Sequence, residues 1–130
     1  MSLFDRRTYE RFLANLPAVE IVHQWDNTSV GKIGGKIFAL HVEDVRETGP
    51  ALSFKVSDMA FDLLPGVPGI APAPYLARAK WVQARKGCGL SEDELRAYVA
   101  AGHRLVAAKL TRALQAELGL TAWLAGSQIP

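Results

Sequence analysis

Apolar and polar residues alternate along the chain from Val30 to Val56, with the period of two that half-buried strands show. Gly34-Gly35 divides this segment, and both glycines can adopt the positive φ that a two-residue type I′ turn requires. The polar residues 43–50 (EDVRETGP) predict a loop. The pattern therefore predicts a hairpin and a further strand that share one apolar face, made of Phe38, Leu40 and Val42 and of Leu52, Phe54 and Val56.

The residues before the hairpin predict one helix and one strand. Asp5 can cap a helix that runs to about Leu16, with apolar residues at i, i+3, i+4 and i+7, and Pro17 ends it. Asp26-Asn27 predicts the turn into the hairpin. Between them we expect a strand with one half-buried side, made of Val19, Ile21, His23 and Trp25.

The second half of the chain carries clear helix signals. Ser57 can cap a short helix to about Leu64, and the proline-rich residues 65–74 predict a fixed loop without regular structure. A turn follows, and then a strand over about residues 80–85. Ser91 and Glu94 form a capping box before a single helix of about 28 residues, which ends at Gly119. Trp123 indicates that the C-terminal segment packs against the domain.

Together these elements predict an α+β protein, with helices packed on one face of an antiparallel sheet and a long helix near the C-terminus. The 130 residues, 49% of them apolar, fit one domain with its core at about residues 5–119. No apolar run is long enough to span a membrane, and the charged N-terminus lacks the apolar stretch of a signal peptide. With a single cysteine, Cys88, the sequence predicts a cytoplasmic protein without internal disulfides.

No catalytic motif or metal-binding pattern stands out in the sequence. His23, His41 and His103 lack metal-ligand spacing, and a half-exposed position in a strand accounts for His41. Cys88 lies in a glycine-flanked turn beside basic residues, but no motif supplies the base that would activate it. Gly34-Gly35 lies between two strands, so it does not fit a phosphate loop. We therefore predict a non-enzymatic protein with no cofactor and no metal site.

One segment is locally basic. Residues 78–86 contain four cations and no acid, in a chain whose net charge is +2. Basic side chains interleaved with aromatics can follow a phosphate backbone and stack on bases. The alternative is a solvated strand whose Trp81 faces the core. With the lysines of the hairpin and of the strand after it, the candidate nucleic-acid-binding residues are Lys32, Lys36, Lys55, Arg78, Lys80, Trp81, Arg85 and Lys86.

Four segments of the chain, taken in order, resemble the MmcQ/YjbR-like proteins: GGKIFAL (34–40), PALSFKVSDMAFDLL (50–64), YLARAKWV (75–82) and the capped terminal helix. The resemblance implies a small α+β fold related to that of the frataxins, with a double-wing arrangement. Proteins of this family are commonly labelled DNA-binding. They often have histidines where this chain has Tyr75 and Lys80, whereas Trp81 is kept. The resemblance therefore supports a basic site and not histidine chemistry.

Two functions from different classes follow. The first is a non-enzymatic DNA-binding protein whose basic surface contacts phosphates weakly, because such contacts position a protein without reading sequence. The second is a protein-interaction or adaptor module that uses the same exposed surface. A small-ligand pocket between residues 65–74 and the sheet, lined by Tyr75, Trp81 and His41, ranks after both. An exposed edge strand permits self-association without requiring it, so the oligomeric state is left open.

Overall fold

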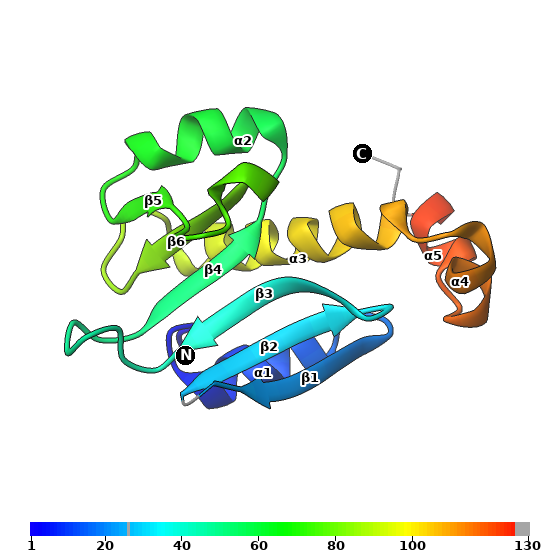
Figure 1. Ribbon diagram of the computed structural model, residues 1–130, viewed down its shortest axis with the longest axis horizontal. Helices are drawn as coiled ribbons and strands as arrows, with labels where there is room; N and C mark the ends of the chain where they lie inside the picture. The colour runs from blue at the N-terminus through cyan, green and yellow to red at the C-terminus, as the bar shows by residue number, and fades with distance from the viewer. Residues whose placement is uncertain (26, 127–130) are drawn as a thin grey trace.

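A computed structural model describes residues 1–25 and 27–126 (Figure 1). Its six-stranded antiparallel sheet has the order β1-β2-β3-β4-β6-β5. The strands are β1 (Val19–Gln24), β2 (Thr28–Ile33), β3 (Lys36–Val42), β4 (Ala51–Lys55), β5 (Ile70–Pro72) and β6 (Trp81–Arg85). The helices are α1 (Arg6–Ala14), α2 (Asp58–Leu63), α3 (Glu92–Lys109), α4 (Arg112–Glu117) and α5 (Thr121–Gly126), with short 3₁₀ helices η1 (Leu64–Gly66) and η2 (Ala77–Ala79).

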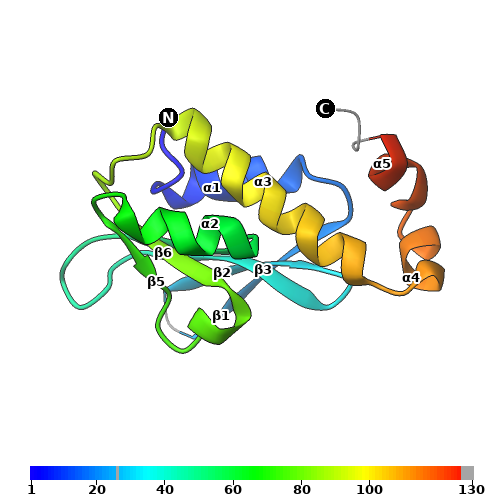
Figure 2. The same ribbon diagram turned by 90° about the horizontal axis from the view of Figure 1, so that it is seen from above.

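Helices α1, α2 and α3 lie on the same face of the sheet, and α4 and α5 lie beyond the C-terminal end of α3 (Figure 2). This arrangement confirms the predicted α+β class. The core between the layers contains the side chains of β4 and β6 that face α3, including Leu52, Phe54 and Val82, with Leu95 and Val99 of α3. None of the described helices is long and apolar enough to span a bilayer.

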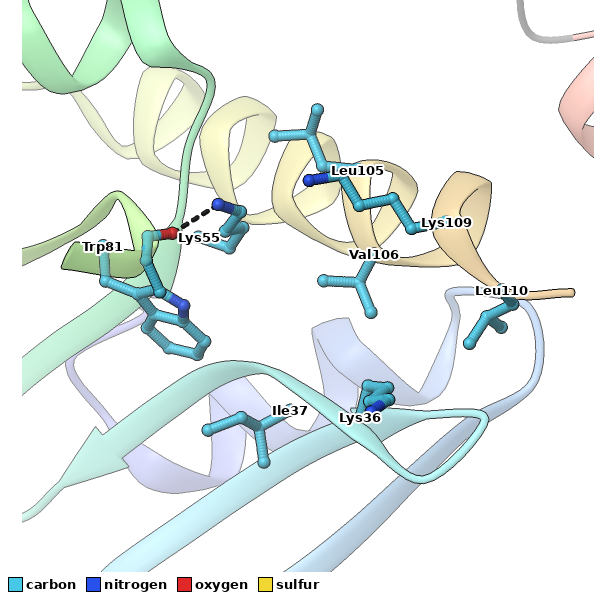
Figure 3. A pocket seen from close by; sticks show the side chains of 9 residues that line it. Lys36, Ile37, Lys55, Trp81, Leu105, Val106, Lys109 and Leu110 are labelled. Atoms are coloured by element: carbon cyan, nitrogen blue, oxygen red, sulfur yellow. Dashed lines mark hydrogen bonds between the residues drawn. The ribbon is translucent and has the colours of Figure 1, made fainter. Parts of the chain in front are cut away.

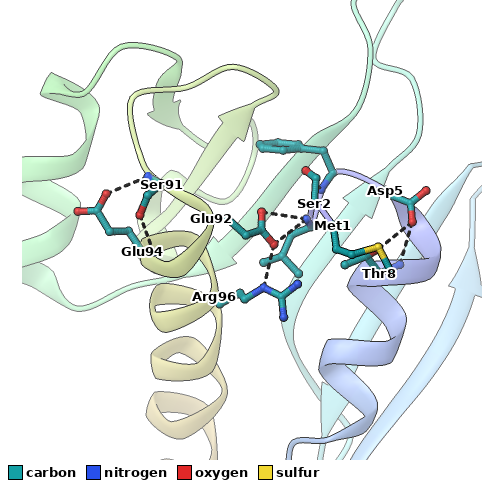
Figure 4. Close-up of polar contacts among 10 residues, drawn as sticks. Met1, Ser2, Asp5, Thr8, Ser91, Glu92, Glu94 and Arg96 are labelled. Atoms are coloured by element: carbon teal, nitrogen blue, oxygen red, sulfur yellow. Dashed lines mark hydrogen bonds and ion pairs between the residues drawn. The ribbon is translucent and has the colours of Figure 1, made fainter.

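The predicted local signals act where the sequence places them. Gly34 and Gly35 have φ of +59° and +81° and connect β2 to β3. Asp5 caps α1 by accepting a hydrogen bond from the Thr8 amide, and Ser91 and Glu94 form the capping box of α3 (Figure 4). Asp26, half of the turn predicted before the hairpin, lies outside the described residues.

Glu92 in the first turn of α3 anchors the N-terminal segment. Its carboxylate accepts a hydrogen bond from the Leu3 amide at 3.0 Å and one from the Arg96 Nε at 2.8 Å (Figure 4). The Arg96 guanidinium also lies 5.3 Å from the centre of the Phe12 ring on α1. These contacts hold the N-terminal segment and α1 beside the start of α3.

The predicted face of β3 was wrong because the strand contains an irregularity. The register between β2 and β3 shifts between Gly31 and Lys32, and Phe38 has no partner residue on β2. A strand that gains one residue changes the face to which its side chains point. Phe38, Ala39 and His41 are therefore all buried, whereas Leu40 and Val42 are only partly buried.

His41 is consequently a core residue, contrary to the expected half-exposed position. It is fully buried, its ring centre lies 5.2 Å from that of Tyr9, and its Nε2 is 2.8 Å from the Phe4 carbonyl oxygen. The Arg6 side chain donates to its Nδ1 at 3.4 Å. His41 thus has structural partners on both ring nitrogens, which leaves no free position for a ligand.

The proline-rich segment was predicted as a loop, but it contains the 3₁₀ helix η1 and the edge strand β5. Ile70, Ala71 and Pro72 pair with β6. An edge strand has one side without strand partners, so Pro72 can occupy it without removing a hydrogen bond from the centre of the sheet.

The single long helix predicted after Ser91 is two helices. Leu110 has an extended conformation, with φ of −68° and ψ of 156°, and the Thr111 side chain caps α4 by accepting from the Leu114 amide. The Gln115 side-chain amide donates to the carbonyl oxygens of Ala107, Ala108 and Leu110 and so satisfies the open end of α3. Gly119 ends α4, and the expected packing of Trp123 is confirmed by its edge contact with His103 at 5.1 Å.

Candidate nucleic-acid interface

The sheet opens between β3 and β4 near the hairpin turn. Their register covers only the four pairs from Ala39–Phe54 to Val42–Ala51, so the first residues of β3 diverge from the end of β4. The second half of α3 crosses over this divergence (Figure 3). A pocket of about 280 Å³ lies there, which we call the splay pocket. Its lining comes from β3, β4, η2, β6 and α3.

Three lysines line the splay pocket: Lys36 on β3, Lys55 on β4 and Lys109 on α3. Lys36 and Lys109 are exposed, and Lys55 is half-buried. The Lys55 ammonium donates a hydrogen bond to the Ala79 carbonyl oxygen (Figure 3). Within residues 1–25 and 27–126, none of the three lysines forms an ion pair with a carboxylate.

Burial lowers the pKa of Lys55 from its ordinary value, and the positive charges of Lys109 and Lys80 lower it further. The nearby charge of Asp58 opposes this shift without forming an ion pair. A group whose charged form is disfavoured by burial and by like charges gains from a nearby anion. The arrangement therefore favours binding of negative charge at the mouth of the pocket.

Two more cations flank Ala79, which lines the pocket. Arg78 is exposed on η2. Lys80 has a left-handed conformation, with φ of +63°, and its ammonium lies 4.9 Å from the centre of the Phe61 ring on α2. We call Lys36, Lys55, Arg78, Lys80 and Lys109 the basic rim.

Apart from the lysines, the lining of the splay pocket is apolar. It includes Ile37, Trp81, Leu105, Val106 and Leu110. Trp81 is only 3% exposed, so its ring is a wall of the pocket and does not offer a stacking surface to a base outside it. The alternative prediction, in which Trp81 faces the core, therefore describes its ring better.

The remaining predicted cations lie elsewhere. Lys32 is on β2, beside Glu20 of β1 in the register, and does not line the pocket. Arg85 is at the opposite end of β6 from Trp81, about 13 Å away at the usual rise per residue of a strand. Its guanidinium donates to the Thr48 hydroxyl of the loop between β3 and β4, and the exposed Lys86 follows it. The predicted residues thus do not form one band.

Sequence reasoning missed Lys109. It occupies a position in the apolar stripe of the long helix, where it looked like a simple interruption. The structure places it at the pocket mouth with Lys55. A single lysine within an otherwise apolar stripe was the available signal, and it could have been read as a cation directed at the sheet.

The small-ligand pocket predicted between residues 65–74 and the sheet is wrong in its lining. Tyr75 is fully exposed, and His41 packs against Tyr9 on α1. Of the three residues proposed for that pocket, only Trp81 lines the splay pocket, which lies instead between α3 and the divergence of β3 from β4.

Another polar cluster joins α1 to β1 and β2. One oxygen of the Glu10 carboxylate accepts a hydrogen bond from the Ser29 hydroxyl at 2.5 Å. The same oxygen lies 2.5 Å from the Nε2 of His23. In a Ser–His–acid triad the histidine stands between the other two groups, so this geometry does not activate the serine. No group of three or more metal-ligating side chains occurs in the described part of the chain.

The sequence and the fold both match known proteins. The chain is 26% identical to the Deinococcus radiodurans protein DR2400, whose crystal structure contains a DUF419 domain, with a TM-score of 0.75 over 88% of each chain. A Pseudomonas syringae protein of known crystal structure shares the fold at 18% identity, with a TM-score of 0.64 over 78% of this chain and 97% of that one. A comparison with curated proteins finds no match.

The family comparison covers most of the domain. The model of the YjbR family matches residues 14–105, from the end of α1 to the second half of α3. This range includes the hairpin, β4, η2 and β6, and with them four members of the basic rim, whereas Lys109 lies just beyond it. The chain belongs to the YjbR family.

Proposed function

We propose that this protein is a non-enzymatic DNA-binding protein that contacts the phosphate backbone through its basic rim. The observation that carries the proposal is the meeting of lysines from β3, β4 and α3 at one opening, without a carboxylate ion pair among the described residues. Arg78 and Lys80 on η2 extend this positive surface. Side chains with no internal counter-ion keep their charge available for an external one.

The geometry favours backbone contact over base recognition. Lysine ammonium groups act as point charges, and phosphate contacts fix the position of a protein on DNA without reading sequence. The buried Trp81 ring does not stack on outside bases. The expected binding is weak, in the range of roughly 10⁻⁴ to 10⁻⁶ M that non-specific DNA binding shows at physiological salt.

A fluorescence anisotropy titration of labelled duplex DNA tests the proposal. The affinity should fall steeply between about 50 and 200 mM salt, because each phosphate contact releases counterions. The double variant Arg78→Glu/Lys80→Glu should bind more weakly and show a shallower dependence on salt. Failure to bind at low salt, or an affinity that does not change with salt, would overturn the proposal.

A protein-interaction module is the second candidate, and one observation favours it. Met59 and Leu63, four residues apart on α2, are 73% and 67% exposed. Residues with this spacing lie on one face of a helix, and exposed apolar side chains that lie together mark contact surfaces. A pull-down from nuclease-treated lysate, compared between the wild type and Met59→Ser/Leu63→Ser, separates the two candidates. A partner that survives nuclease and is lost in the variant supports this second function.

A further inference from the structure

We propose that the splay pocket binds a small amphipathic anion, with an apolar chain inside and a carboxylate held between Lys36, Lys55 and Lys109. This site is distinct from DNA binding, because it uses the interior of the pocket as well as its mouth. The proposal combines two features at one place, an apolar wall and an unpaired cationic mouth. Neither feature alone selects such a ligand.

The interior of the pocket fits an apolar chain. Ile37, Val106 and Leu110 line it, with the Trp81 ring beside them, and Leu105 adds to the lining next to Lys109 (Figure 3). The volume of about 280 Å³ is just below the roughly 300–1,000 Å³ of pockets for drug-sized ligands, so the occupant is small. Apolar side chains offer no hydrogen bonds to the edge of a nucleobase, which argues against an unpaired base as the occupant.

The mouth of the pocket fits a single anionic group. The three lysines come from different elements, so a carboxylate between them would contact cations on more than one side. Lys55 is half-buried beside Lys109, and an anion there would offset both its burial and the repulsion between the two charges. The Trp81 indole lies in the same wall, where its N–H supplies a further donor (Figure 3).

Three probe molecules separate the two features. Decanoate has both a chain and a carboxylate, decanol has the chain alone and acetate has the carboxylate alone. Binding is followed through the indole N–H signals in a two-dimensional ¹H–¹⁵N NMR spectrum, with assignment from Trp25→Phe and Trp123→Phe variants. Decanoate at up to about 1 mM should shift the Trp81 signal in a saturable manner and leave the exposed Trp25 unchanged. Decanol and acetate should bind at least about tenfold more weakly.

Two variants link the binding to the lysines. Lys55→Met keeps most of the length of the side chain and removes its charge, and Lys36→Met does the same at an exposed position that carries little risk to folding. Each should weaken decanoate binding by about tenfold or more and leave decanol unchanged. Lys86→Met, at the far end of β6, is the matched control and should bind decanoate like the wild type.

The outcomes separate this proposal from DNA binding. Equal binding of decanoate and decanol, no shift of Trp81, or equal loss in Lys36→Met and Lys86→Met would overturn the anion site. Saturable decanoate binding by a protein that fails to bind DNA would support the anion site and contradict the proposed function. DNA binding without decanoate binding would support the proposed function and contradict the anion site.

Discussion

Gly102 on α3 packs directly against the main chain of Lys55 at the end of β4. A Cβ atom at Gly102 would lie 2.6 Å from the Lys55 carbonyl oxygen, closer than real Cβ contacts come. The absence of a side chain therefore sets how closely α3 approaches the sheet. Because Lys109 follows two helical turns later on α3, this contact also fixes the place of Lys109 relative to Lys55 at the pocket mouth.

Gly102→Ala should destabilise the protein. In an exposed helix this change normally stabilises by about 1 kcal/mol, because alanine has the higher helix propensity. Here the added methyl group meets the backbone of β4, and overpacking of this kind costs about 1–3 kcal/mol. The expected result is a lower free energy of unfolding in urea.

Ala101→Gly is the control for this experiment. Ala101 is exposed on the same helix, so the change tests propensity alone and should destabilise by about 1 kcal/mol. Destabilisation by both changes, although they alter propensity in opposite directions, supports the close packing of Gly102. A Gly102→Ala protein as stable as the wild type, or more stable, would show that α3 can move away from β4 freely.

Gly34→Ala should cost more stability than Gly35→Ala. Both glycines have positive φ, so alanine is strained by about 1–2 kcal/mol at either position. A Cβ atom at Gly34 would also lie 2.7 Å from a methyl group of the buried Leu110, whereas nothing lies within 4 Å at Gly35. Urea unfolding of the two variants measures the difference.

A second background tests the cause of that difference. In Leu110→Ala the two nearest methyl groups that Gly34 faces are gone and only a Leu114 methyl group at 3.2 Å remains, so the costs of Gly34→Ala and Gly35→Ala should become more similar there. If the difference between the two alanine variants persists in this background, contact between the hairpin turn and Leu110 does not explain it.

His103 should make the stability depend on pH between about 5 and 6.5. Burial lowers its pKa from the ordinary value near 6.5, and the hydrogen bond to the Pro17 carbonyl at 2.8 Å only partly offsets this. Its Nδ1 is buried without a hydrogen-bond partner in the described residues. The unfolded chain therefore binds a proton more readily, so the free energy of unfolding falls as the pH drops below about 6.5.

Thermal and urea unfolding of His103→Gln across this range measure the effect. The glutamine amide can still donate to the Pro17 carbonyl but does not titrate, so the dependence on pH should decrease by up to about 1.4 kcal/mol per pH unit. Burial also lowers the pKa of His41, so a part of the pH dependence of stability should remain in this variant. Hydrogen bonds from Thr8 lower the pKa of Asp5, which titrates below about pH 4 and outside this window. An unchanged pH dependence in His103→Gln would contradict this assignment.

Local signals in the sequence predicted most of the elements. Asp5, Ser57 and Ser91 cap helices as expected, and Gly34-Gly35 forms the hairpin turn, because each of these roles depends on a few neighbouring residues. The features that were missed depend on distant partners. Phe38 interrupts the alternation of β3 because of how β2 and β3 pair, and Pro72 becomes part of a strand only because β6 offers an edge.

The candidate site was predicted only in part, because it too depends on residues that are distant in the sequence. Lys36, Lys55, Arg78 and Lys80 were identified from local charge, and the divergence of β3 from β4 places Lys36 and Lys55 at one opening, where Ala79, between Arg78 and Lys80, also lines the pocket. Arg85 and Lys86 belong to the same basic segment of sequence, but β6 carries them to the other end of the sheet. Lys109 joins the site through the path of α3 across the sheet, which no local pattern contains.

The measurement that tests the central claim most directly is the salt dependence of duplex DNA affinity in three proteins. These are the wild type, Lys36→Gln/Lys109→Gln at the basic rim, and Arg85→Gln/Lys86→Gln at the far end of β6. The rim variant should lose about 1.8 from the slope of log affinity against log salt, about 0.9 for each phosphate contact, and the far variant should keep the slope of the wild type. An unchanged slope in the rim variant, or the same loss in both variants, would contradict the account.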